Sequence, residues 1–329
     1  MLVVEIIQKI RKNNKIDELV LKDATGMFIV SYDKVCEEVE AGNLTVLGYT
    51  VVRNGDSLEL KESECTTEVT TVNDSIIIDR DLIDMIEQNT KLAFKTVNNI
   101  SEELLRFNGE VSMISQNCFI EMIDDTINVV SDKKFRIVDG YELFQDKQFK
   151  AVDLSNVDMT EIKTAERMFE GCAIRDLLLT CGCTSQLKST KAMFMNSKIY
   201  SLAFKSIQTK NVEDMSYMFC NSTIGKFRTY RSTFNTQNVV DMTKMFFRCS
   251  NDTIKNAKVD SFNISSLLSA DFMFSKCDAE TVDISKWNIT DILSMKGCFS
   301  GANIDTLVVN KESLPDSPEM FVNATIKNM

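Results

Sequence analysis

The residues best suited to chemistry are the 10 cysteines, because the chain contains no histidine. Histidine is the commonest general base, proton shuttle and metal ligand, so Ser-His-Asp and Cys-His catalysis within this chain are excluded. Cys181 and Cys183 form a C-x-C pair, but the sequence has no C-x-x-C pair of the kind typical of zinc sites. We therefore expect no metal and no cofactor, with metal or redox chemistry at Cys181 and Cys183 as the alternative.

Three other cysteines share one position of a repeating pattern, since Cys172, Cys249 and Cys277 each lie three residues after a phenylalanine. The equivalent position elsewhere holds a serine or an alanine: Ser197, Ser222, Ala302 and Ala324. A position that accepts only Cys, Ser and Ala is typical of a small buried side chain, so we expect a structural role there. Neither a glycine-rich phosphate loop nor a paired-carboxylate acid/base frame is found, and the sequence predicts that the chain is not an enzyme.

The composition narrows the kinds of partner. The 329 residues are 44% hydrophobic and 26% charged, with a formal net charge of -11, which indicates a folded, acidic chain. Phosphate contacts need clustered Lys and Arg, so nucleic acid is not expected as the main ligand, and a basic protein partner is favoured. Glu5 follows directly after Met1–Val4, and no apolar run is long enough to span a membrane, so we expect a cytoplasmic protein with reduced cysteines.

The elements that would position these residues follow from an internal repeat. A pair that ends in phenylalanine recurs at intervals of 22 to 28 residues, at 168–169, 193–194, 218–219, 245–246, 273–274, 298–299 and 320–321. Steps of 25 residues backwards reach Phe144, Phe119 and Phe94. The pattern predicts a repeat array from about residue 73 to residue 329, with nine or ten repeats and degenerate first repeats.

Each repeat is predicted to contain one helix and one strand. Small or apolar residues stand three and six residues before each pair, as at Val212 and Met215, which places them on one helix face that ends at the phenylalanine. Asn211 and Asn238 precede this segment and could cap it. Short apolar runs follow each phenylalanine and are expected to be strands: 76–78, 127–130, 151–154, 177–179, 202–204, 281–284 and 307–309. The expected fold is an α/β solenoid of leucine-rich-repeat-like units of ~25 residues.

The segments Asn211–Phe219 and Asn238–Phe246 share the pattern Asn-Val-x-Asp-Met-x-x-Met-Phe. This pattern resembles the BspA-like leucine-rich repeats of bacterial surface proteins, most clearly over residues 150–310. The resemblance implies a curved solenoid with a parallel sheet on its concave face, in a family whose members are typically exported adhesion proteins.

Residues 1–65 do not fit the repeat and are predicted to form a small α+β domain. Strands are expected at 16–21 and 27–30, a helix at 32–41, and a hairpin of 44–52 with 57–60 around the Asn54-Gly55 turn. This ββαββ order resembles a short module of Firmicutes phage and mobile-element proteins.

Two surfaces are candidates for binding, and for each the alternative is an ordinary solvated face. If Val152 and Leu154 point inward, one register of the strands exposes a row of residues for a protein partner: Asp153, Leu178, Ala203, Arg228, Asp260, Asp283 and Val308. The second candidate is an acidic stretch that could imitate nucleic acid: Asp79, Asp81, Asp84 and Glu87, joined by Glu121, Asp124 and Asp125. The predicted function is non-enzymatic binding of a protein, as a phage- or mobile-element-encoded inhibitor of a host defence protein such as a CRISPR nuclease. The alternative is a cell-surface adhesion repeat protein whose export signal has been removed.

Overall fold

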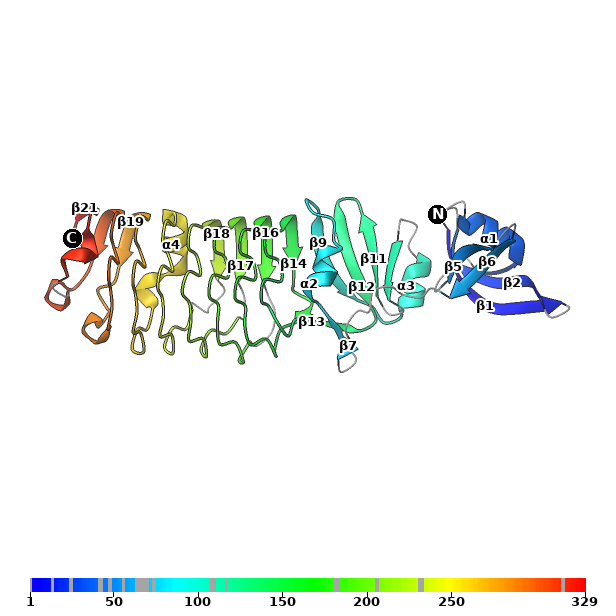
Figure 1. Cartoon of the computed structure of the whole chain (residues 1–329), viewed down its shortest axis with the longest axis horizontal. Helices are drawn as coiled ribbons and strands as arrows, with labels where there is room; N and C mark the ends of the chain where they lie inside the picture. The colour runs from blue at the N-terminus through cyan, green and yellow to red at the C-terminus, as the bar shows by residue number, and fades with distance from the viewer. Residues whose placement is uncertain are drawn as a thin grey trace. The chain divides into compact units, whose positions relative to one another are not determined.

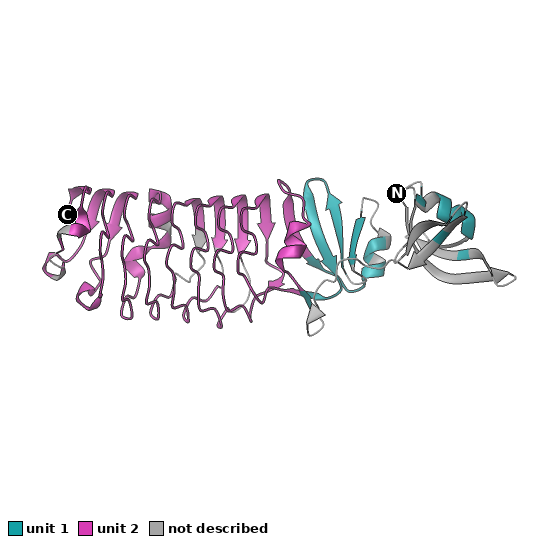
Figure 2. Ribbon diagram, in the orientation of Figure 1, with its two compact units in different colours: residues 1–76, 95–134 teal, residues 77–94, 135–329 magenta. Residues whose placement is uncertain are grey.

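The computed structural model divides the chain into two compact units, and each is described by itself (Figure 2). Unit 1 comprises residues 1–76 and 95–134, and unit 2 comprises residues 77–94 and 135–329. The structure describes residues 2–12, 15–23, 26–40, 44–46, 49–54, 57–62, 71–72, 75–106, 111–115, 118–179, 184–204, 207–229, 234–314 and 317–329.

The first part of unit 1 is a four-stranded sheet with one helix and a separate hairpin. The sheet has the order β3-β2-β1-β4, in which β1 runs antiparallel to β2 and parallel to β4. Its elements are β1 (Leu2–Lys12), β2 (Lys15–Asp23), β3 (Gly26–Ser31), α1 (Tyr32–Glu40) and β4 (Leu44–Val46), and the hairpin pairs β5 (Tyr49–Asn54) with β6 (Ser57–Glu62). The predicted helix and hairpin are present, but β1 was missed, and the single strand expected at 44–52 is divided between β4 and β5.

The second part of unit 1 corrects the predicted start of the repeat array. It contains β7 (Thr71–Val72), β8 (Ser75–Ile77), α3 (Ile100–Arg106), β10 (Val111–Ser115), β11 (Cys118–Ile123) and β12 (Thr126–Ser131). Phe119 lies in β11, which is antiparallel to both β10 and β12, and it packs with Ile100, Leu104 and Val130. The turn between Ile123 and Thr126 is only two residues long, which permits an antiparallel hairpin and no parallel coil. The expectation that Phe94 and Phe119 are repeat anchors like the later phenylalanines is therefore wrong, because both residues lie in strands: Phe119 in β11, and Phe94 of unit 2 in β9 (Lys91–Thr96).

Unit 2 is a stack of coils whose strands are parallel (Figure 1). One run of paired strands is β9 (Lys91–Thr96), β14 (Gln148–Asp153), β16 (Ala173–Leu179), β17 (Lys198–Phe204) and β18 (Thr223–Thr229). A second run is β19 (Asp278–Asp283), β20 (Asn303–Val308) and β21 (Thr325–Asn328). The pairing connects Ile174 with Ile199 and Ile199 with Ile224, so each coil advances the chain by 25 residues along this part of the stack.

Tight turns replace the predicted repeat helices in the described coils, except at the last anchor, Phe321, where the short 3-10 helix η4 (Pro318–Phe321) is present. The amide of Phe169 donates to the carbonyl of Met193 in the next coil, and the amide of Phe194 donates in the same way to Met218. A helix would direct these amides to the residue four positions earlier. Apolar residues at intervals of three and six fit both a helix face and a stacked turn, which is why the spacing alone was misleading.

Polar side chains that were expected to cap helices instead connect and close the coils. The amide nitrogens of Asn211 and Asn238 donate to the carbonyls of Ser185 and Lys210 in the preceding coils, at 2.7 and 2.8 Å. The Asp214 carboxylate accepts the amide hydrogen of Ser216, two residues later, and thereby fixes its own turn.

A continuous ladder of stacked phenylalanine rings runs through the stack. Adjacent ring centroids are 5.0 to 5.7 Å apart, with interplanar angles between 5° and 11°. The rings belong to Phe144, Phe169, Phe194, Phe219, Phe246, Phe274, Phe299 and Phe321. All except Phe321 are fully buried, so the ladder forms the core of unit 2.

One coil carries a helix where its neighbours carry a strand. Helix α4 (Asn251–Ala257) lies between β18 and β19 and contacts both, and it divides the strands into two sheets (Figure 1). The hydroxyl of Thr253 on this helix accepts the amide hydrogen of Ile224 in β18, at 3.1 Å. The 3-10 helix η1 (Val259–Ser261) follows at once.

The remaining elements of unit 2 are short: α2 (Arg80–Asp84), β13 (Lys134–Arg136), β15 (Val157–Asp158), η2 (Ile289–Asp291), η3 (Lys311–Ser313) and η4 (Pro318–Phe321). In the described part of the chain, no helix combines the length and the apolar character that a membrane crossing needs.

Candidate interaction surface

The residues of the predicted outward row are neighbours within each sheet, but the row is not continuous. Asp153, Leu178 and Ala203 are half-buried neighbours, and the backbone of Arg228 pairs next to Ala203. The side chain of Arg228 lies outside the described residues. Asp283 pairs with Val308 in the second sheet, which α4 separates from the first.

Asp260 is the member of this row that was placed wrongly. It lies in η1 and not in a strand, because this coil contains helical turns where a strand was expected. Asp153 and Asp283 each accept the amide hydrogen of the serine two residues later, at 2.8 and 2.9 Å. The hydrogen bonds from Ser285 lower the pKa of the Asp283 carboxyl, so this carboxylate has a role in closing its own coil.

A second outward row was not foreseen, and it carries the more distinctive chemistry. Between the buried residues Ile174 and Leu177 both Arg175 and Asp176 are exposed, so strict alternation fails in this strand. The same spacing of three separates Ile199 from Leu202. The sequence contains a signal for this row: the recurring apolar-x-x-apolar spacing within the strands. A regular strand with a period of two would place only one outward residue between two buried ones, and here there are two.

Four cations and one tyrosine gather on this face of β14, β16, β17 and β18. We call Lys150, Arg175, Lys198, Tyr200 and Lys226 the strand-face patch; all five are exposed. The patch lies at a shallow hollow of about 620 Å³, which is lined by Asn89, Phe149, Lys150, Ala173, Ile174, Arg175, Lys198, Ile199, Tyr200, Thr223 and Gly225. Lys226 borders the hollow through its contact with the Tyr200 ring.

Tyr200 is the centre of the patch. Its side chain is 55% exposed, with the Lys226 ammonium 5.2 Å and the Arg175 guanidinium 6.0 Å from the ring centroid. These distances suit cation–π attraction, which holds both cations beside the ring. A Cβ atom on Gly225 would lie 2.9 Å from the carbonyl oxygen of Tyr200, so a glycine lets these two strands approach closely.

The patch is locally basic in a chain whose net charge is -11. Asp176 forms an exposed ion pair with Arg175 at 3.7 Å, a kind of contact that contributes little free energy. The corresponding strands of the second sheet expose acidic residues instead, among them Asp278 and Glu280. The outward strand face therefore changes its charge along the stack.

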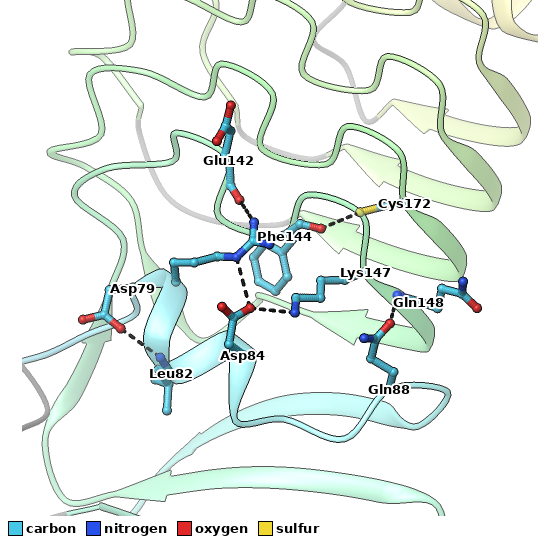
Figure 3. Close-up of polar contacts among 10 residues, drawn as sticks. Asp79, Leu82, Asp84, Gln88, Glu142, Phe144, Lys147, Gln148 and Cys172 are labelled. Carbon is cyan, nitrogen blue, oxygen red and sulfur yellow. Dashed lines mark hydrogen bonds and ion pairs between the residues drawn. The ribbon is translucent and has the colours of Figure 1, made fainter. Parts of the chain in front are cut away.

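The predicted acidic stretch at the start of unit 2 is partly structural. Asp79 caps α2 by accepting the amide hydrogen of Leu82 at 3.0 Å (Figure 3). Asp84 forms ion pairs with Lys147 at 2.6 Å and Arg80 at 3.0 Å. The hydrogen bond from Lys147 is the largest of the effects that lower the pKa of Asp84.

Further contacts attach α2 and the residues after it to the stack. Arg80 also donates a hydrogen bond to the carbonyl of Glu142, and Gln88 accepts the amide hydrogen of Gln148 at 3.1 Å (Figure 3). Asp81 and Glu87 are exposed and remain available to solvent. The stretch is therefore not a uniform acidic face, since Asp79 caps α2 and Asp84 pairs with Lys147 of the first coil.

Glu121, Asp124 and Asp125 belong to unit 1. Glu121 is only 2% exposed, its Oε1 atom has no hydrogen-bond partner, and the nearest ammonium, that of Lys95, lies 4.0 Å away. Burial raises the pKa of the Glu121 carboxyl, and the charge of Lys95 offsets this only in part.

We expect Glu121→Gln to stabilise the chain near pH 7 by on the order of 1 kcal/mol, because the neutral amide avoids the burial of a charge. A raised pKa means that stability is lost as the pH rises above about 4.5, the ordinary value for glutamate, through the pKa of the folded state. Urea unfolding at several pH values measures this, and the gain should vanish at or below pH ~4.5. A variant that is less stable at pH 7 would show that the pairing with Lys95 dominates.

The described cysteines have the properties of structural residues. Cys172 and Cys249 are buried, and their thiols donate to the carbonyls of Phe144 and Phe219 at 2.8 and 2.6 Å. Burial raises the pKa of Cys172, Cys249 and Cys277 to about 12, which leaves them as neutral thiols. No group of metal ligands occurs among the described residues, and Cys181 and Cys183 lie outside them.

One family accounts for most of unit 2. The model of the family described as "Mycoplasma protein of unknown function, DUF285" matches residues 135–201 and 188–311, more than half of the chain, and the chain belongs to this family. No curated protein and no solved structure matches the chain.

Proposed function

We propose that the chain is a non-enzymatic binding protein and that its strand-face patch docks an acidic segment of a protein partner. The observation that carries this proposal is the group of four cations around the exposed Tyr200. Tyrosine and arginine are enriched in binding hot spots, and the cations supply complementarity to carboxylates. The sequence had favoured a basic partner, but the charge of this face favours an acidic one.

Other features support a binding role. The turn pattern resembles BspA-like leucine-rich repeats, and we propose that the coils are a divergent form of that α/β solenoid, with turns in place of helices. A rigid stack presents several strands side by side, so one extended segment can contact successive coils. The cytoplasmic location and the absence of enzymatic activity, metal and cofactor stay predictions of the sequence.

The narrower hypotheses have less support. Inhibition of a nucleic-acid enzyme by charge mimicry depended on the acidic stretch, and Asp79 and Asp84 are engaged within the stack. Adhesion depended on the resemblance alone, and no contact described above favours it over binding of another protein.

The proposal predicts that acidic peptides bind and that reversal of two patch charges removes the binding. Labelled decapeptides rich in Glu, Asp and Tyr are titrated with the full chain at physiological salt, beside neutral and basic peptides of equal length. We expect Lys198→Glu with Lys226→Glu to weaken acidic-peptide binding by at least about tenfold, or ~1.4 kcal/mol. Tyr200→Ala should weaken it as well, whereas Tyr200→Phe should retain most of it.

A matched control changes the net charge equally at another place. Lys255 and Lys327 are exposed and pair with Glu280 and Asp305 beside the second sheet, so Lys255→Glu with Lys327→Glu leaves the patch intact. Equal losses in both double variants would mean that net charge, and not the patch, governs binding. The absence of any preference for acidic peptides would refute the proposal.

A further inference from the structure

A second group of cations and aromatic rings lies on the turns, away from the strands in each coil. We call Tyr217, Lys244, Phe247, Arg248, Phe272 and Lys276 the turn-face cluster; they come from three successive coils. The Lys244 ammonium lies 5.2 Å from the Tyr217 ring and 5.8 Å from both the Phe247 and the Phe272 rings. The Arg248 guanidinium lies 5.3 Å and the Lys276 ammonium 5.8 Å from the Phe247 ring.

Three positive charges therefore surround a single aromatic ring, that of Phe247. Such cations repel one another, and none of the three forms an ion pair with a carboxylate of the described residues. Attraction to the ring holds each cation in place but does not neutralise it. An anion that contacts all three would remove this repulsion, so the arrangement is organised in advance for a multiply charged anion.

Two of the cations occupy a turn position at which the other coils carry different residue types. Arg248 and Lys276 adopt φ angles of 56°, in the left-handed region that favours Gly, Asn and Asp. The equivalent turn position in the other coils holds only such residues: Asp146, Gly171, Asn196, Asn221, Gly301 and Asn323. Arg248 and Lys276 therefore depart from the residue preference of this one position, whereas the earlier positive-φ position of the same turns also accepts residues such as Arg167 and Ala192.

A glycine in the next coil makes space for the cluster. A Cβ atom on Gly297 would lie 2.5 Å from Cε1 of Phe272, so a larger residue would displace that ring. Phe272 in turn is one of the three rings beside Lys244. Glycine at position 297 therefore lets the Phe272 ring stay beside the Lys244 ammonium.

We propose that the turn-face cluster binds a phosphate monoester or inorganic phosphate. A phosphate dianion has three oxygens that can each accept from a different cation, and a guanidinium can donate to two of them. A single carboxylate has too few oxygens and too little charge to engage all three. This site is separate from the strand-face patch and does not depend on the function proposed for it.

The test replaces two cations by the residue that the same turn position carries elsewhere. Arg248→Asn with Lys276→Asn should keep the fold, since Asn196 and Asn221 occupy equivalent positions with similar φ angles. Inorganic phosphate is titrated calorimetrically into the full chain, and phosphatidylcholine vesicles with and without phosphatidic acid are used in flotation. We expect saturable binding to at least one phosphate source, weakened at least about tenfold in the double variant.

The control carries the same change of charge on earlier turns, as Arg167→Asn with Lys191→Asn, and should bind like the unchanged protein. Binding of inorganic phosphate assigns the site to a free phosphate group, whereas binding of phosphatidic acid vesicles alone assigns it to a lipid headgroup. If neither source binds, or if the two double variants lose binding equally, the proposal is overturned.

Discussion

Phe219→Ala is expected to destabilise unit 2 by about 3–5 kcal/mol. The ring is fully buried between Phe194 and Phe246, 5.6 Å from each, and its removal interrupts the ladder in the middle of the stack. It also contacts the edges of Phe227 and Phe234, at 6.2 and 5.9 Å. A cavity remains because the neighbouring coils fix their own rings and cannot collapse into the space.

Urea unfolding monitored by circular dichroism measures this loss, and Phe321→Ala is the matched control. Phe321 has the same ladder position in its coil but is only half-buried, and its one ladder neighbour is Phe299 at 5.3 Å. Because repeat proteins are stabilised mainly by nearest-neighbour contacts, its loss should cost well under half as much. Equal losses at both positions would contradict the view that the ladder holds the coils together.

Alkaline pH should destabilise unit 2 through its buried thiols. A thiol with a pKa of about 12 in the fold, against the ordinary value of 9.0, stays neutral where the unfolded chain would ionise. The contribution of each thiol to the free energy of unfolding is therefore fully present below pH ~9. It is lost as the pH rises through the pKa of the folded state. Near pH ~10.5 each such thiol should contribute a loss of roughly 2 kcal/mol, since one pKa unit corresponds to about 1.4 kcal/mol.

The double variant Cys172→Ser with Cys249→Ser separates this effect from the titration of lysine and tyrosine side chains. Ser197 and Ser222 show that the position accepts a hydroxyl, which donates to the carbonyl of the preceding phenylalanine at 2.7 Å in both coils. We expect the double variant to lose about 4 kcal/mol less than the unchanged protein between pH ~7 and ~10.5. Urea unfolding at the two pH values measures this loss. If the double variant and the unchanged protein lose the same free energy of unfolding between these two values, the thiols do not control the alkaline transition.

The sequence allowed a good prediction of the strands and the period, and a poor one of the turns. The run Leu177–Leu179 lies in β16 and the run Leu307–Val309 overlaps β20. Short apolar runs rich in β-forming residues favour strands over other structures, so these two strands could be predicted. The segment Val212–Phe219 was assigned to a helix, since its apolar spacing is the same in a stacked turn. A helix and a stacked turn differ here only in the backbone hydrogen bonds to the next coil. The preferences of single residues do not predict such bonds between coils.

The candidate surfaces were harder to predict because they depend on neighbours in different coils. Arg175, Tyr200 and Lys226 are about 25 residues apart, and one extra outward residue per strand brings them to the same face. Lys244 and Phe247 lie in a segment whose period indicated a buried core, so no pattern in the sequence indicated that their half-buried side chains form a surface cluster. Asp84 was identified as acidic and exposed, but its ion pair with Lys147 depends on how α2 lies against the first coil.

Helix α4 shows how such an array tolerates changes in length. The strand-side pairing stops at this coil, yet the phenylalanine ladder passes from Phe246 to Phe274 at 5.6 Å, and the backbone bridge from Asp241 to Ser269 continues beside it. At this coil the turn side keeps the spacing of the stack, while the strand side accommodates a helix in place of a strand. Residues inserted after the phenylalanine of a duplicated coil would therefore change the outer surface of the stack. They would leave the stacking of the phenylalanine rings unchanged.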